Sequence, residues 1–105
     1  MKFYLDQSNL THTARHLIEQ EVSNFVGRSE EQAVEMLGSR ALEVFKRHCD
    51  TEGFAETADG AKIWNCYKGV CALFTQVSET TYPVFHDNDT EPDRRIMITF
   101  YSYLG

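Results

Sequence analysis

The chain has 105 residues, of which 42% are hydrophobic and 25% are charged. This length predicts one compact domain over residues 1–105, and the apolar content excludes a disordered chain. The formal net charge is −6, from 16 acidic and 10 basic residues. This balance argues against a protein that binds nucleic acid directly, because phosphate binding needs clustered lysine and arginine.

We expect neither a secretory signal nor a membrane span. An acidic residue stands at position 6, and the longest apolar run, over 70–74, is far shorter than the roughly 20 residues that a membrane span needs. The three cysteines are an odd number without the spacing of a disulfide framework. We therefore expect reduced thiols and a cytoplasmic protein.

The first half of the chain has the period of two amphipathic helices. Apolar residues recur at helical spacing over about 10–26, and Gly27 ends this pattern. Ser29 with Gln32 three residues later is a capping box, and it begins a second helix over about 30–49. Because only about three residues join them, the two helices are expected to pack as an antiparallel hairpin.

In the second half the period changes to two, which is typical of strands. Asp59-Gly60 and, more weakly, Lys68-Gly69 are predicted hairpin turns. Two short segments, 3–5 and 81–85, are candidates for edge strands. The main strands are predicted over about 54–58, 61–67, 70–77 and 96–103. The chain is thus expected to be an α+β protein whose N-terminal helical hairpin packs on one face of an antiparallel β-meander of three to five strands.

Strand alternation leaves apolar residues on both faces of this sheet. With a two-residue turn at Lys68-Gly69, one side is expected to carry Ile63, Asn65, Tyr67, Val70, Ala72 and Phe74. The other side would carry Trp64, Cys66, Cys71, Leu73 and Val77. Since two helices cover only one face, the second face is expected to lie under a long loop or to contact a partner or a second copy.

Cysteines and histidines are the first candidates for chemistry. Cys66 and Cys71 are expected directly opposite each other, as packed thiols rather than as a redox or metal pair. His12 and His16 lie one helical turn apart on a solvent-facing side, which favours a solvated face over a metal site. His48 falls on the apolar side of the second helix and is expected to be partly buried. The sequence predicts no metal site and no cofactor.

Residues 87–91 resemble the start of a calcium loop. The sixth position is Pro92 and the twelfth is Ile98, where such a loop needs glycine and glutamate. We therefore interpret this segment as a solvated acidic loop. The glycines are scattered singly, and neither a phosphate-binding loop nor a G-x-S-x-G motif is present.

Aromatic side chains concentrate near the end of the chain. Tyr101 and Tyr103 share one side of the last predicted strand with Met97. Tyrosine supplies a large contact area with a polar tip and is enriched in protein interfaces. Together with the acidic loop, these positions predict a set of partner-binding residues: Trp64, Tyr67, Met97, Tyr101, Tyr103, Asp87, Asp89 and Glu91.

The sequence favours a small, acidic, non-enzymatic protein-binding domain, of the inhibitor or immunity type that occludes a basic, nucleic-acid-handling partner. We expect no membrane partner and assign no catalytic residue. One alternative is a structural homodimer that pairs through the last strand. The other is a small metal-independent hydrolase or ribonuclease that uses His12, His16 or His48 with Arg40, Tyr67 or Tyr101.

Overall fold

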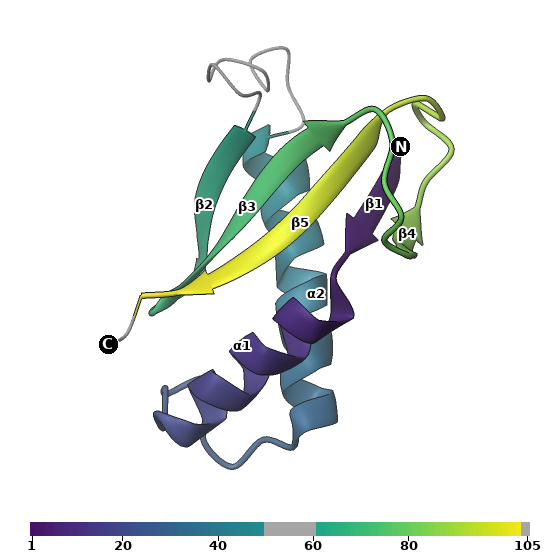
Figure 1. The fold of residues 1–105 in the computed structure, drawn as a ribbon. Coiled ribbons are helices and arrows are strands. Elements are labelled where there is room, and N and C mark those ends of the chain that lie inside the picture. The colour runs from purple at the N-terminus through teal and green to yellow at the C-terminus, as the bar shows by residue number, and fades with distance from the viewer. Residues whose placement is uncertain (50–60, 104–105) are drawn as a thin grey trace.

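The structure, a computed structural model, describes residues 1–49 and 61–103. It is an α+β protein with two α-helices and a five-stranded, mostly antiparallel sheet (Figure 1). The elements are β1 (Lys2–Leu5), α1 (Gln7–Glu19), α2 (Glu30–Val44), the π-helical turn η1 (Phe45–Cys49), β2 (Ala61–Tyr67), β3 (Val70–Val77), β4 (Val84–Asp87) and β5 (Arg95–Ser102). The predicted strand over 54–58 and the Asp59-Gly60 turn lie outside the described residues.

The first helix is shorter than predicted and begins earlier. Asp6 caps its N-terminus, where its carboxylate accepts hydrogen bonds from two backbone N–H groups of the first turn. The helix ends at Glu19, and Glu21 adopts a φ of 52°, which a helix does not permit. Val22 and Phe25 are buried all the same. Their helical spacing therefore reflects the core and not a continuing helix.

The second helix begins as predicted. The Ser29 side chain accepts from the Gln32 backbone N–H, and the Gln32 side chain accepts from the Ser29 N–H, which completes the capping box. The α-helix ends at Val44, and the last five residues of the predicted span form the wider η1 turn. Midway along α2, a Cβ on Gly38 would lie 2.6 Å from a Phe85 ring carbon, so glycine lets β4 approach the helix.

The sheet is not a meander. Its strand order is β2-β3-β5-β1-β4, with β1 parallel to β5 and antiparallel to β4. The segment over 3–5, expected at an edge, thus lies inside the sheet, while β4 takes one edge. The chain after β3 runs past β5 and β1 to reach β4 (Figure 1). Because β1 is far from β4 and β5 in the sequence, no turn motif indicates that these strands pair.

A side chain continues the sheet where β1 ends. The last residue of β1, Leu5, pairs with Ile98. Beyond this pair, the backbone groups on the same edge of β5 have no strand beside them. Asn9 of α1 supplies both bonds: its Nδ2 donates to the Phe100 carbonyl at 3.0 Å, and its Oδ1 accepts from the Phe100 N–H at 2.8 Å. This two-bond clamp holds α1 against β5 and satisfies a half-buried stretch of backbone.

One face of the sheet is covered by the helices. Figure 1 shows α2 passing behind the sheet and α1 below it, running obliquely to α2; α1 contacts β5, and α2 contacts β2. Phe45 joins the two layers, since its ring lies 5.2 Å from that of Phe74 and 5.1 Å from that of Phe3. The apolar inward side chains of β3 and β5 are fully or almost fully buried: Val70, Ala72, Phe74, Ile96, Ile98 and Phe100.

A bulge in β2 changes which residues share a face. Asn65 pairs with Cys71, but Tyr67 pairs with Val70, so Cys66 is an extra residue in its strand. The predicted grouping of the two faces is therefore wrong. Trp64 and Cys66 lie on the helix side with Ala72 and Phe74, while Ile63 and Asn65 lie on the other side with Cys71 and Leu73. Cys66 is not opposite Cys71, because Asn65 occupies that position.

Candidate functional site

The outward positions of β2, β3 and β5 form a face that lies on the side of the sheet away from the helices (Figure 1). The strand register aligns them in rows: Asn65 beside Cys71 and Tyr101, Ile63 beside Leu73 and Thr99, and Thr75 beside Met97. We call Ile63, Asn65, Leu73, Thr75, Met97, Thr99 and Tyr101 the open sheet face. None of these side chains is charged; the next outward pair, Val77 with Arg95, brings a charge to the end of the face where β5 begins.

Exposure shows where the open sheet face lies and where it ends. Ile63 is 60% exposed and Tyr101 is 48% exposed, while the middle positions are half-buried by their neighbours. Tyr4 of β1 extends the row of Met97 but is only 8% exposed. Val84 of β4 pairs with Tyr4 and is 51% exposed, so a second accessible apolar position on this side is separated from the open sheet face by the buried Tyr4.

Tyr103 lies at the rim of the open sheet face and fastens two strand ends. Its hydroxyl accepts from the Gly69 N–H and donates to Asn65 Oδ1, both at 3.2 Å. Its backbone N–H donates to the Gly69 carbonyl at 3.0 Å. Although 57% exposed, Tyr103 thus holds the β2–β3 turn against the end of β5.

Two of the predicted partner-binding residues lie on the covered face instead. Trp64 stacks on His48 with the ring centroids 4.5 Å apart. Tyr67 packs edge-to-face on Phe25 at 5.1 Å and donates its hydroxyl proton to the Met36 carbonyl at 3.3 Å. The structure therefore separates Trp64 and Tyr67 from Met97 and Tyr101, which share the open sheet face.

The predicted acidic residues lie at a third place. Asp87 ends β4 beside Lys2, and Asp89 and Glu91 follow in the connection to β5. Glu91 forms an ion pair with Arg94 at 2.9 Å. This connection leads into the start of β5, whereas Tyr101 lies near its end, about 20 Å away at the usual rise per residue. The acids are thus separated from the aromatic end of the open sheet face.

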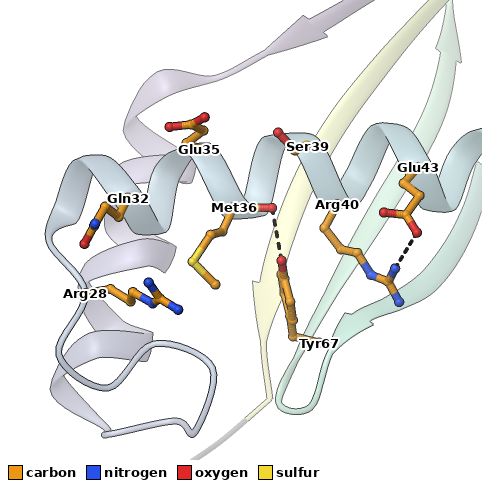
Figure 2. A pocket seen from close by; sticks show the side chains of 8 residues that line it. All are labelled: Arg28, Gln32, Glu35, Met36, Ser39, Arg40, Glu43 and Tyr67. Carbon is orange, nitrogen blue, oxygen red and sulfur yellow. Dashed lines mark hydrogen bonds and ion pairs between the residues drawn. The ribbon is translucent and has the colours of Figure 1, made fainter.

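A groove of about 350 Å³ lies beside Tyr67 (Figure 2). We call it the Tyr67 groove; its lining residues are Arg28, Gln32, Glu35, Met36, Ser39, Arg40, Glu43 and Tyr67. In Figure 2 the side chains of Met36 and Tyr67 lie between those of Arg28 and Arg40. Glu35 and Ser39 project from the opposite flank of α2. Tyr67 is the one predicted site residue in this groove, and Arg28 has no motif that marks it in the sequence.

Arg40 is held in place from several sides. Its Nε donates to the Cys66 carbonyl at 3.0 Å, and its Nη1 lies 2.8 Å from Glu43 Oε1. The same Glu43 oxygen also lies 3.4 Å from Arg47. The guanidinium carbon of Arg40 is 6.0 Å from the centre of the Tyr67 ring. Burial raises the pKa of the Tyr67 phenol, and the charge of Arg40 offsets part of that rise.

Arg28 differs from Arg40. It has no ion pair and no side-chain hydrogen bond within residues 1–49 and 61–103. Its backbone is fixed nevertheless, because its N–H donates to the Phe25 carbonyl at 3.1 Å and the next residue caps α2. The groove thus contains one guanidinium with partners and one without, on either side of an aromatic ring.

The histidines lie on different elements. His12 and His16 are on α1, His48 is on η1 and His86 is on β4. The part of the chain that the structure describes holds no group of three His, Cys, Asp or Glu side chains placed to bind a metal. Arg40 and Tyr67 of the hydrolase alternative do meet in the Tyr67 groove, but its lining contains no histidine.

Cys71 is buried beside Tyr101 on the neighbouring strand, with its Sγ 3.8 Å from the Tyr101 carbonyl oxygen. Burial raises the pKa of this thiol, which makes it less reactive. Cys66 and Cys71 form no disulfide with each other. Cys71 therefore does not supply an activated thiolate to the open sheet face.

No helix among the described residues is long and apolar enough to cross a membrane. Compared with protein-family models, with curated proteins and with solved structures, the chain matches none of them.

Proposed function

We propose that the chain is a small, non-enzymatic protein-binding domain that contacts its partner through the open sheet face. The observation that carries this proposal is an uncharged three-stranded face on which Ile63 and Tyr101 are about half exposed. Interface centres are depleted of charged residues and enriched in tyrosine and methionine, and this face has both properties. An ordinary solvated sheet face would carry charged side chains at these positions.

The partner in this proposal has an apolar contact patch and basic residues around it. The net charge of −6 favours approach to a basic protein, and complementary charge raises the association rate more than the affinity. Asp87, Asp89 and Glu91 would contribute at the periphery because they lie away from the aromatic end of the face. A nucleic-acid-handling protein whose basic groove is occluded by this domain fits that description. A cytoplasmic location is part of the proposal, and it is supported by the free thiols of Cys66 and Cys71 in the described part of the chain.

The test compares the open sheet face with a matched exposed site. A tagged Ile63→Thr/Tyr101→Ser double variant is compared with a Val84→Thr/Tyr82→Ser variant, whose side chains are also exposed but lie on β4 and the segment before it. We expect the wild type and the second variant to capture the same basic protein from the native host, with an association rate that falls as salt increases. The Ile63→Thr/Tyr101→Ser variant should bind this protein at least tenfold more weakly.

Three results would contradict the proposal. They are equal capture by both variants, a captured partner that is acidic, and an association rate that is independent of salt. Light scattering on the purified chain addresses the homodimer separately: a dimer that the Ile63→Thr/Tyr101→Ser variant abolishes would assign the face to a second copy instead.

A further inference from the structure

We infer that the Tyr67 groove binds a small organic carboxylate, with the carboxylate at Arg28 and the apolar body against Met36 and Tyr67, toward Arg40. This site lies on α2 and the covered side of the sheet, so it is separate from the open sheet face. Its volume of about 350 Å³ falls in the lower part of the range for small-molecule sites.

The charges around the groove favour an anion. Arg28 and Arg40 line it together with Glu35 and Glu43, and Arg47 shares the carboxylate of Glu43 from outside. The lining residues carry two positive and two negative charges, but Glu43 pairs with Arg40 and Arg47, and Glu35 projects from the opposite flank of α2. Arg28 is thus the lining guanidinium without an acidic partner among the described residues, and Figure 2 shows its side chain directed toward Met36.

The same charges distinguish a carboxylate from a phosphate. The single unpaired guanidinium of Arg28 matches a monoanion, whereas a phosphate group carries about −1.5 to −2 at neutral pH, which leaves part of its charge unmatched. The planar fork of a guanidinium also fits the two oxygens of a carboxylate. The thioether of Met36 and the ring of Tyr67 supply the apolar wall that a body attached to this carboxylate needs.

The floor of the groove is organised before any ligand arrives. Tyr67 is fixed by the Phe25 ring and by its hydrogen bond to the Met36 carbonyl. Arg40 is fixed by the Cys66 carbonyl and Glu43. Binding therefore has to order one side chain, that of Arg28, which keeps the entropic cost low.

The experiment titrates the full-length chain, labelled with ¹⁵N, with three probes: benzoate, the neutral isostere benzamide, and inorganic phosphate. Chemical shifts of the backbone amides and of the arginine Nε–H groups locate the site. We expect benzoate to shift Arg28, Arg40 and Tyr67, and benzamide and phosphate each to bind at least tenfold more weakly.

Three variants test the assignment. Arg28→Gln should weaken benzoate binding about tenfold, the loss expected for a charge-assisted hydrogen bond. Glu43→Gln should tighten it severalfold, because the groove loses one of its two negative charges. Arg95→Gln, an arginine at the start of β5 that bonds to the Ser78 carbonyl, is the matched control and should leave the affinity unchanged.

The Arg28 side chain is exposed and makes no hydrogen bond or ion pair within the described residues, so its variant is expected to keep the amide spectrum of the folded protein. The inference is overturned if about 10 mM benzoate causes no chemical-shift change at the groove, because a dissociation constant above this concentration would be too weak for a specific site. Equal affinities for benzoate and benzamide, or an Arg28→Gln variant that binds benzoate like the wild type, also overturn it.

Discussion

The two faces of the β2-β3-β5 sheet are built from alternate residues of the same strands, yet they differ in almost every physical respect. The covered face buries Phe74, Ile98 and Phe100 almost completely against the helices. The open sheet face carries Ile63 and Tyr101 in contact with solvent. Neither face contains a charged side chain at these positions, so the polarity pattern alone does not distinguish them.

This comparison shows that an apolar side chain on a strand contributes to stability on one face of the sheet and is expected to contribute to binding on the other. On the covered face its removal leaves a cavity, and the cost appears in the free energy of unfolding. On the open sheet face little packing is lost, and the cost is expected in binding. Substitutions on neighbouring residues of one strand separate these effects.

The largest expected effect is on the covered face. Phe74→Ala removes a fully buried ring that packs on Phe45 at 5.2 Å. We expect the free energy of unfolding to fall by about 3–5 kcal/mol. Leu73→Ala, one residue away on the half-buried open sheet face, should cost about 1 kcal/mol. Urea denaturation of both variants checks this, and equal losses would refute the difference between the faces.

The next effect concerns the clamp between α1 and β5. Asn9→Ala removes the two hydrogen bonds to the Phe100 backbone and leaves a half-buried N–H and carbonyl unpaired. We expect a loss of about 2 kcal/mol in unfolding free energy. Asn65→Ala, on the open sheet face, loses only its bond with the Tyr103 hydroxyl and should cost less than about 1 kcal/mol. Hydrogen exchange of the Phe100 amide should accelerate in the Asn9 variant alone.

Substitutions on the open sheet face should barely change stability. The Ile63→Thr/Tyr101→Ser variant is expected to keep its unfolding free energy within about 0.5 kcal/mol of the wild type, because both side chains are about half exposed. Thermal unfolding provides the measurement. A loss near that of Phe74→Ala would show that this face is part of the core, and it would remove the basis of the proposed interface.

The smallest effect concerns alkaline pH. Burial raises the pKa of Tyr67 above the ordinary 10.0, so above that pH the unfolded chain releases this proton before the folded chain does. Its contribution to stability is complete below pH 10.0 and declines as the pH rises through the folded pKa. Tyr67→Phe should therefore lose stability less steeply between pH 10 and 11, in urea titrations, than Tyr101→Phe, the control from the open sheet face. Equal slopes would contradict this assignment.

Local patterns in the sequence identified most of the elements. The capping box at Ser29 places the start of α2, and the Lys68-Gly69 turn places β2 and β3. These features depend on residues that are neighbours in the chain, so their signals are local. The first helix is predicted to extend too far for a related reason. Phe25 is buried in the core and continues the helical spacing of apolar residues, although it is not part of a helix.

The sheet order and the candidate site required long-range information. The pairing of β1 with β5 and the bulge at Cys66 are set by packing across the molecule, and neither has a turn signature. The single extra residue at Cys66 moved Trp64 and Ile63 to the faces opposite to those predicted. The Tyr67 groove combines the turn before α2, α2 itself and the end of β2, so Arg28 could be recognised only in three dimensions.

The position of β1 has a consequence for how the molecule is made. Its partners on both sides, β4 and β5, begin more than 80 residues later in the chain. During synthesis, β1 therefore lacks both neighbouring strands until residues 84–102 have been added, and α1 lacks its clamp to Phe100 for the same period. Folding has to close this long loop, which predicts slow folding and a nascent chain that benefits from chaperone protection.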